Sequence, residues 1–220
     1  MRSVYIVFSA TPYKMGRLIR TVLHNTYNHI SLSFDADLST MYTFARFHVN
    51  TPFYGGFVSE SPRRYRNAGR DAQIKVCRVS LTEEQFCTLH RFVLHMEQSS
   101  QRYIYNMYSA LFAPLHIRLL IHDSYTCTEF VGDALSVAGL DIPRGAFHSL
   151  QKLEETLDSC MIYEGSCAEY TQFISWGNDH FPERIPTLSG TVATARTMGQ
   201  LTLRGVSDLY SYVRLPRDRR

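Results

Sequence analysis

The sequence lacks several features that would indicate particular classes of protein. No apolar run approaches the roughly 20 residues needed to cross a membrane. The opening residues also lack the long apolar stretch and small-residue cleavage site of a secretory signal. The formal net charge of +3 is too small to indicate a nucleic-acid partner. We therefore expect no nucleic-acid partner, no integral membrane segment and a cytoplasmic location.

Cysteine is scarce, and its spacing is not that of a metal or redox site. No two cysteines form a C-x-x-C pair, and no zinc-ligand spacing occurs. His90 and His95 lie five positions apart, which does not place two ligands on one face of a helix. The odd number of cysteines favours free thiols in a reducing compartment. We expect no metal and no cofactor. The sequence has five cysteines, of which we expect at least four to be structural: Cys77, Cys87, Cys127, Cys160 and Cys167.

The rest of the composition is typical of a globular protein. The chain has 220 residues, of which 45% are hydrophobic and 13% aromatic, enough to bury a substantial core. The apolar pattern weakens after about Gly165. We therefore expect one domain over residues 1–165, large enough to be a catalytic domain, and a C-terminal extension over residues 166–220. The extension's pattern leaves a hairpin, an oligomer contact and a partly mobile tail open, and the oligomeric state is not indicated.

Alternating apolar and polar residues predict strands in the first half of the chain. Residues 5–9 form a short buried strand, and residues 30–34 alternate as a half-buried strand does. His29 opens this second strand and shares its polar face with Ser31 and Ser33. The stretch "TMYTFARF" returns as the partner strand of a hairpin. Residues 55–60 form a brief strand or a loop, and residues 73–80 form a further strand.

Helical periodicity predicts several helices. Residues 11–25 carry an apolar face made of Met15, Leu18, Ile19, Val22 and Leu23. Residues 80–98 form a long surface helix, with Ser80 and Glu83 at the spacing of a capping box. A helical stretch is broken near Pro114, and a short helix over residues 149–157 precedes a strand over residues 160–165. The basic loop with Arg63, Arg64, Arg66 and Arg70 is either a solvated surface or a site for an acidic ligand.

The stretch "DSYTCTEFVGDAL" places one cysteine at the start of a helix. Phe130, Val131, Ala134 and Leu135 recur at helical spacing, and Gly139 marks the end. Cys127 therefore falls in or just before the first turn, where unpaired N–H groups and the helix macrodipole favour an anion. The thiolate is the nucleophilic form of cysteine. Cys127 is thus a candidate nucleophile, and the alternative is a small apolar core residue.

The segment "YTCTEFVGDAL" resembles the nucleophile helix of NlpC-type peptidases, a branch of the papain-like superfamily. "NHISLSFD" is similar to the histidine strand of the same enzymes. The histidine precedes the cysteine here, as in the circularly permuted group that includes lecithin:retinol acyltransferase-like enzymes and bacterial and poxviral proteins. "MYTFARF…PFYGGFVSE" is also similar to a segment of bacterial members. The resemblance covers roughly residues 3–165.

The resemblance implies an α+β, papain-like fold, in which an antiparallel sheet packs against a helical part that bears the nucleophile. It makes Cys127 the nucleophile and His29 the general base. It also makes the backbone N–H of Cys127 an oxyanion donor, and Tyr105 a residue that lines the oxyanion region. The alternative for Tyr105 is a buried core tyrosine.

The third polar residue of the family's site has no direct counterpart. The family carries a His, Asn, Gln or Glu on the strand after the histidine. The stretch "TMYTFARF" has Tyr42, Thr43 and Arg46 but no His, Asn, Gln or carboxylate. Thr43 could accept a weak hydrogen bond from the imidazole. Glu60, a little later, would accept a stronger one, and we favour it over Thr43. The alternative for Glu60 is a surface carboxylate.

The function implied is that of a cysteine peptidase or amidase, a thiol-dependent hydrolase with a Cys–His pair. Its substrate is a peptide, amide or acyl ester (or thioester), cleaved through an acyl-enzyme, and an acyltransferase is possible by the same chemistry. Two alternatives stay open. One is an inactive binding module on the same fold, favoured by the unusual third residue. The other is a lipid-directed acyltransferase or phospholipase.

Overall fold

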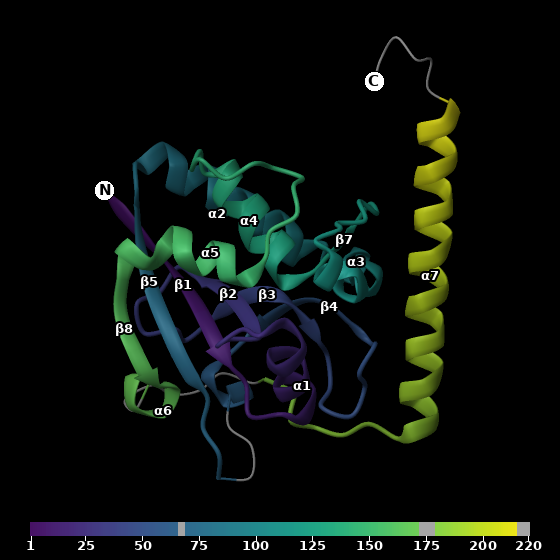
Figure 1. The fold of residues 1–220 in the computed structure, drawn as a ribbon, viewed down its shortest axis with the longest axis horizontal. Helices are drawn as coiled ribbons and strands as arrows, with labels where there is room; N and C mark the ends of the chain where they lie inside the picture. Colours follow the sequence, from purple (N-terminus) through teal and green to yellow (C-terminus); the bar gives the residue numbers. More distant parts are fainter. Residues whose placement is uncertain (66–68, 172–178, 215–220) are drawn as a thin grey trace.

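The centre of the molecule is a mixed sheet (Figure 1). The computed structural model describes residues 1–65, 69–171 and 179–214. Within these ranges the eight strands of the sheet run in the order β7-β6-β4-β3-β2-β1-β5-β8. All neighbouring pairs are antiparallel except β6 and β7, which are parallel. The strands are β1 (Arg2–Ala10), β2 (His29–Ser33), β3 (Met41–Arg46), β4 (Gly55–Glu60), β5 (Gln73–Leu81), β6 (Ile104–Tyr105), β7 (Ser124–Tyr125) and β8 (Met161–Ser166).

Helices cover the sheet, so the fold is α+β, as predicted (Figure 1). Helices α2, α4 and α5 lie together over one face, and α6 lies towards the other, against the short 3-10 helix η1 (Pro62–Tyr65). The α-helices are α1 (Lys14–Leu23), α2 (Glu83–Gln98), α3 (Met107–Phe112), α4 (Cys127–Val137), α5 (Leu150–Leu157), α6 (Cys167–Tyr170) and α7 (Thr187–Arg214). The remaining 3-10 helices are η2 (Ser100–Arg102), η3 (Ala113–Leu115) and η4 (Asp158–Cys160).

Strand β1 lies in the middle of the sheet and is buried on both faces. Ile6 and Phe8 belong to the core beneath the helices, whereas Val7 packs on the opposite face with Ile74 and Val76. A nearly continuous apolar sequence suits such a strand, because neither face meets water. The strand is longer than the predicted residues 5–9, since β5 pairs with it from Arg2 to Ala10.

The prediction of a half-buried strand over residues 30–34 is wrong, because all five residues of β2 are buried. The predicted hairpin with β3 is confirmed by the pairing of Leu32 with Tyr42. Ser31 and Ser33 alternate with apolar residues as expected, yet neither faces water. Ser33 donates to the carbonyl oxygens of Asp35 and Thr40, so its hydroxyl is satisfied inside the protein. Alternation alone could not show that the polar face is covered.

Helix α2 begins later than its predicted capping box. Thr82 is the N-cap: its hydroxyl accepts from the backbone N–H of Gln85, whose side chain accepts from the N–H of Thr82. The predicted cap, Ser80, is instead part of β5, where it pairs with Ser3 of β1. The sheet pairing therefore takes the residues that local spacing had assigned to the helix.

Helix α1 forms as predicted, but its apolar face is not buried in the core. Leu18 is 59% and Val22 54% exposed. The helix makes its close approach through Gly16, where a Cβ would meet Thr11 and Asn28 within 3.0 Å. Because the close contact is confined to Gly16, the apolar side chains of α1 stay partly exposed to solvent.

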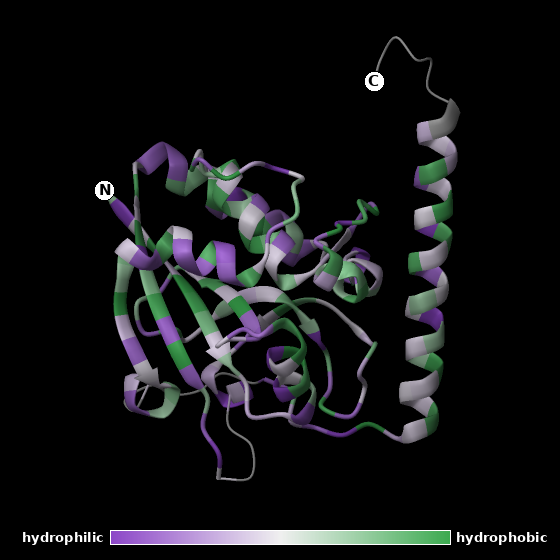
Figure 2. Cartoon of the chain, viewed as in Figure 1, coloured by the Kyte–Doolittle hydropathy of each residue, from purple (hydrophilic) through white to green (hydrophobic). Residues whose placement is uncertain are grey.

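Residues 187–214 form α7, a 28-residue helix rather than a hairpin (Figure 1). Leu201 is fully buried against Ile104 and Ile121 and anchors the helix beside the β6–β7 edge. Arg204 donates to the carbonyl oxygens of Arg102 and Asp123 at 3.0 and 3.1 Å. Hydrophobic and hydrophilic residues are interleaved along α7 (Figure 2). Neither α7 nor another helix in the described ranges is long and apolar enough to span a bilayer.

Candidate active site

Cys127 is the first residue of α4, which confirms its predicted position at a helix start. A capping box fixes this start. The Thr126 hydroxyl accepts from the N–H of Glu129 at 3.3 Å, and the Glu129 carboxylate accepts from the N–H of Thr126 at 2.7 Å. These bonds satisfy two amides of the first turn and leave that of Cys127 for another acceptor. Cys127 is buried, with 8% of its surface exposed to solvent.

His29 opens β2, and its ring faces a buried carboxylate. Its Nε2 lies 3.2 Å from each carboxylate oxygen of Glu60, at the end of β4. Burial alone would lower the pKa of His29. The Glu60 carboxylate and a side-chain hydrogen bond with Cys127 outweigh it and raise that pKa to about 10. The structure therefore brings together Cys127, His29 and Glu60, the three residues that the sequence and the resemblance singled out.

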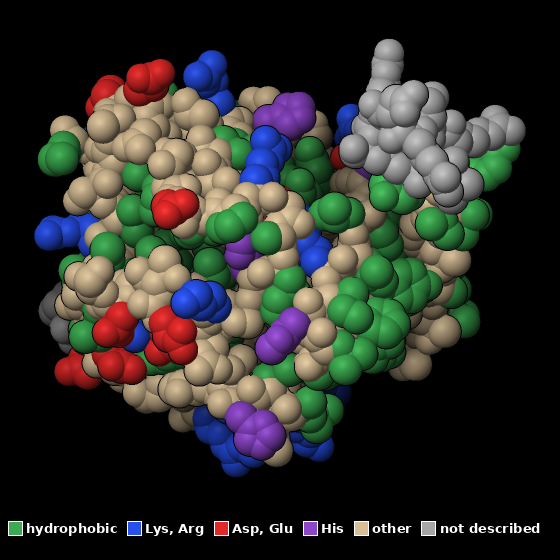
Figure 3. Space-filling model, turned by 45° about the horizontal axis from the view of Figure 1, so that its top comes forward, with side chains coloured by type: hydrophobic (Ala, Val, Ile, Leu, Met, Phe, Trp, Pro, Cys, Tyr) green, Lys and Arg blue, Asp and Glu red, His purple; other side chains and the backbone are tan. Residues whose placement is uncertain are grey.

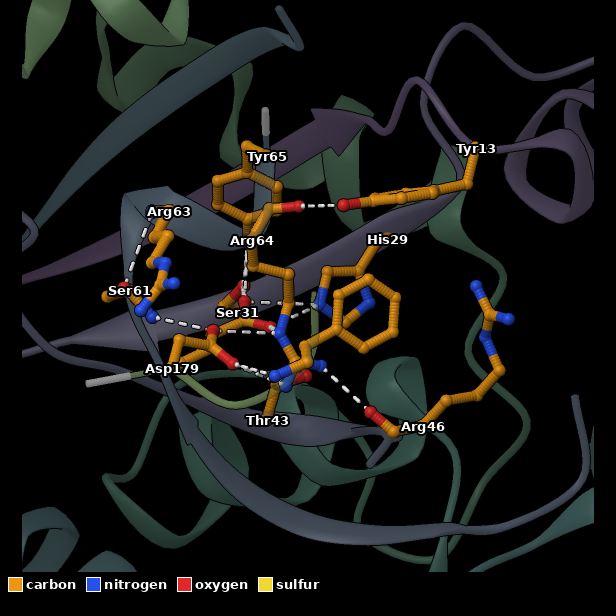
Figure 4. A network of polar contacts seen from close by, with 12 residues as sticks. Tyr13, His29, Ser31, Thr43, Arg46, Ser61, Arg63, Arg64, Tyr65 and Asp179 are labelled. Carbon is orange, nitrogen blue, oxygen red and sulfur yellow. Dashed lines mark hydrogen bonds and ion pairs between the residues drawn. The ribbon is translucent and has the colours of Figure 1, made fainter. Parts of the chain in front are cut away.

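Glu60 is buried and contacts four side chains of a polar network, His29, Ser31, Arg64 and Tyr65, which Figure 4 labels. The hydroxyls of Ser31 and Tyr65 both donate to its Oε1, and the Arg64 Nε lies 3.4 Å from its Oε2. Burial opposes the charge of Glu60, but His29, Arg64 and the Ser31 hydroxyl outweigh it and lower its pKa to about 2. The carboxylate is thus held charged without exposure to water, and Glu60 is not a surface residue.

Arg64 links this network to a residue that the sequence did not suggest. Its Nε and Nη2 lie 3.0 and 3.2 Å from the two carboxylate oxygens of Asp179, a bidentate arrangement. The solvated-surface interpretation of the basic loop is therefore wrong for Arg64, which is 5% exposed, although Arg63 and Arg70 are exposed. Arg66 lies outside the described residues.

Cys127 and His29 line one cleft of about 270 Å³. Its walls come from α1, β3, the β6–α3 segment and the chain after residue 179. Most of them are apolar. The lining includes Tyr13, Met15, Ile19, Phe44, Arg46, Tyr105, Met107, Ala110, Leu111 and Phe181.

Tyr105 and Thr43 have different surroundings. Tyr105 lines the cleft beside Cys127, and burial together with the Cys127 side chain raises the pKa of its hydroxyl well above the usual value. A neutral hydroxyl at this point can donate a hydrogen bond. Thr43 does not serve the imidazole, because its hydroxyl donates to the carbonyl oxygen of Ile30 at 2.7 Å. The expectation that Thr43 could orient His29 is therefore corrected.

The other four cysteines do not line the cleft, and none of the five forms a disulfide. Cys77 is in the core, where burial raises the pKa of its thiol to about 12. Cys87 is exposed on α2. The described ranges contain no cluster of three or more His, Cys, Asp or Glu side chains able to hold a metal ion.

Comparisons of the chain with protein-family models, curated proteins and solved structures found no match. The roles of these residues are therefore argued from geometry and chemistry.

Proposed function

We propose that the protein is a cysteine hydrolase with a circularly permuted papain-like fold, acting on an amide or ester carbonyl through an acyl-enzyme. One observation carries the proposal. The thiol of Cys127, at the start of α4, lines the same cleft as the imidazole of His29, and the Nε2 atom of that imidazole contacts the buried carboxylate of Glu60. This is the arrangement that nucleophilic cysteine catalysis uses: a thiol, an adjacent base and a third group that orients the base.

The ring geometry assigns the two nitrogens of His29. Because Nε2 faces Glu60, Nδ1 is the nitrogen left for the Cys127 thiol. In the proposed reaction Nδ1 takes the thiol proton, and the sulfur then forms a bond to the substrate carbonyl carbon. The carbonyl oxygen becomes an oxyanion that the N–H of Cys127 can bind, with the Tyr105 hydroxyl as a further donor.

The second half of the reaction restores the enzyme. His29 returns its proton to the leaving amine or alcohol as the carbon–leaving-group bond breaks. Water then gives a proton to His29 and forms a bond to the acyl carbon. The carbon–sulfur bond breaks, the acid product leaves, and His29 returns its proton to the Cys127 sulfur. An acceptor alcohol or amine in place of water would make the same site an acyltransferase. Glu60 holds the ring and stabilises the imidazolium throughout.

A second candidate, a hydrolase or acyltransferase for lipids, is favoured by an apolar rim beside the cleft. Figure 3 shows hydrophobic side chains gathered on the side of the molecule where α3 and α7 lie. Leu111 on α3, Leu115 on η3 and Leu120 in the chain that follows are each 65–71% exposed. Exposed apolar side chains that gather in one region are a feature of membrane-interaction sites. Vesicle flotation tests this candidate: a lipid enzyme binds vesicles, and replacing Leu111 and Leu115 with Ser abolishes the binding.

Thiol labelling tests the proposed nucleophile. At pH 7 we expect iodoacetamide to label Cys127 well before the other four cysteines, as followed by peptide mass spectrometry. His29→Ala slows the labelling of Cys127 on the order of tenfold or more, because the imidazole no longer assists ionisation. The exposed Cys87 is the internal control, and its rate is the same in both proteins. Equal labelling of Cys87 and Cys127 would overturn the assignment.

Turnover separates an enzyme from an inactive binding module. A series of p-nitrophenyl acyl esters releases nitrophenol in a burst when an acyl-enzyme forms. We expect a burst with the natural chain and none with Cys127→Ser. A reactive Cys127 with no burst and no acyl adduct for any ester would favour the binding module.

A further inference from the structure

Arg46 is a cation in the wall of the cleft that the proposed reaction does not use. It ends β3 and lines the same cleft as Cys127 and His29. One of its five N–H groups is engaged, because Nη1 donates to the carbonyl oxygen of Val49 at 3.2 Å. Its guanidinium carbon lies 5.3 Å from the centre of the Phe181 ring. Figure 4 shows its side chain extending away from the Arg64–Asp179 pair.

The pairing of Arg46 differs from that of the buried arginines. Arg64 contacts the carboxylates of Glu60 and Asp179, and Arg118 contacts those of Glu129 and Asp133. No carboxylate of the described residues forms an ion pair with Arg46, although the residue is half-buried. Buried or partly buried charges in proteins are ordinarily paired.

The charges near Arg46 increase this imbalance. Burial lowers the pKa of Arg46, and the positive charge of Arg64 lowers it further. The negative charges of Glu60 and Asp179 are already satisfied by His29 and Arg64. An anion entering the cleft would therefore meet a guanidinium in a partly dry setting, where charge-assisted hydrogen bonds are strong.

The remaining walls define the rest of the ligand. Met15 and Ile19 from α1 face the cleft on one side, and Met107 and Leu111 from α3 line it on another. These flexible apolar side chains suit a hydrocarbon or apolar side chain rather than a polar one.

We propose that Arg46 binds an anionic group of the substrate, so that the protein acts on compounds that combine an apolar acyl or side chain with a carboxylate or phosphate. This inference rests on the proposed cysteine hydrolase. It adds a specificity residue for a reaction whose chemistry is performed by Cys127 and His29. The carboxylate and the phosphate share the chemistry that a guanidinium recognises, and they differ in their source.

A pair of alkylating agents tests Arg46 directly. Iodoacetate and iodoacetamide react alike with a thiolate but differ in charge. Relative to free N-acetylcysteine, we expect Cys127 to prefer iodoacetate by about tenfold, the order of a charged hydrogen bond. Arg46→Gln should lower the iodoacetate rate several-fold more than the iodoacetamide rate, and the His29 imidazolium accounts for the preference that remains. The backbone oxygen of Arg46, which accepts from Arg64, is unchanged by this substitution.

Arg17→Gln is the matched control, because Arg17 is an exposed arginine on α1 and does not line the cleft. It should keep the iodoacetate preference. The Arg46 proposal is overturned if Arg46→Gln keeps the preference undiminished, if the natural chain shows none, or if Arg17→Gln loses it equally. A slow iodoacetamide reaction in the natural chain would instead count against the proposed hydrolase.

A protection experiment needs no variant and identifies the source of the anion. N-dodecanoylglycine, its neutral amide and dodecyl phosphate are compared for their ability to slow iodoacetamide labelling of Cys127. Protection by either anion at concentrations where the amide has no effect supports the proposal. The better protector identifies a carboxylate or a phosphate. Equal protection by the amide would contradict a role for charge.

Discussion

Glu60 contacts both the imidazole of His29 and the guanidinium of Arg64. Its carboxylate does so from a position that is 1% exposed. A buried carboxylate is stable only when its charge and hydrogen bonds are satisfied, which here involves two cations and two hydroxyls. Neutralising Glu60 therefore affects both the imidazole and the stability of the fold.

The pH dependence of stability tests this role. Because the pKa of His29 is raised to about 10, the native state holds a proton that the unfolded chain loses near pH 6.5. The stabilisation is complete below pH 6.5 and is lost as the pH rises through about 10. We expect the free energy of unfolding, measured in urea, to fall across this range in the natural chain.

Glu60→Gln removes the main charge that raises the pKa of His29, so the fall in stability should become much shallower. The slope against pH is the readout, because the substitution also lowers stability at every pH. An unchanged slope in Glu60→Gln would show that Glu60 does not hold the imidazolium.

The residues of the site differ in how visible they were in the sequence. Helical spacing placed Cys127 at a helix start and alternation placed His29 at a strand start, and both positions are confirmed. Their catalytic roles stay predictions. Asp179 could not be found, because it meets Arg64 across 115 positions of sequence and no local pattern marks that pairing. The burial of Arg64 was missed for the same reason.

At the scale of elements, α4 must approach its neighbours closely to hold Cys127 in the cleft. Gly132 lies in its middle, and a Cβ there would come within 2.3 Å of the His148 ring. Local sequence patterns do not mark this contact, because they carry no information on what packs against the middle of a helix. Local rules likewise chose Ser80 as a cap, whereas the pairing of β5 with β1 moved the cap to Thr82.

Two glycine substitutions test the packing of α4. Gly132→Ala should lower the free energy of unfolding by about 1–3 kcal/mol, since the added methyl group overpacks the contact with His148. Gly199→Ala is the control in α7, where nothing lies within 4 Å, and it should be neutral or stabilising by up to about 1 kcal/mol. Urea unfolding measures both. A neutral Gly132→Ala would mean that α4 and His148 separate easily.

At the scale of the whole molecule, the chain beyond residue 165 takes part in the site. Asp179 accepts from Arg64 and from the N–H of Ser61, and Phe181 lines the cleft. The weakening of the apolar pattern after Gly165 suggested a C-terminal extension of unknown role over residues 166–220. The periodicity of apolar residues indicates only which faces of helices and strands are buried. It cannot detect a segment that contacts the rest of the protein through the buried Arg64–Asp179 ion pair and through α7.

Asp179→Ala tests whether this segment stabilises the fold. Loss of one partner leaves Arg64 short of a carboxylate in a buried setting, so we expect a cost of about 3–5 kcal/mol in the free energy of unfolding. Asp208→Ala is the matched control, because its ion pair with His122 is partly exposed and worth about 0–1 kcal/mol. Similar costs for both variants, measured by urea unfolding, would show that the buried pair adds no special stability.

Helix α7 lies along one edge of the central sheet. The sheet ends at β7, and an end strand ordinarily offers unpaired main-chain groups as a template for a foreign strand. Arg204 occupies carbonyl oxygens near this margin, while Leu201 fastens the helix alongside it. Removing α7 would therefore leave this edge open to pairing with a strand from another copy of the chain.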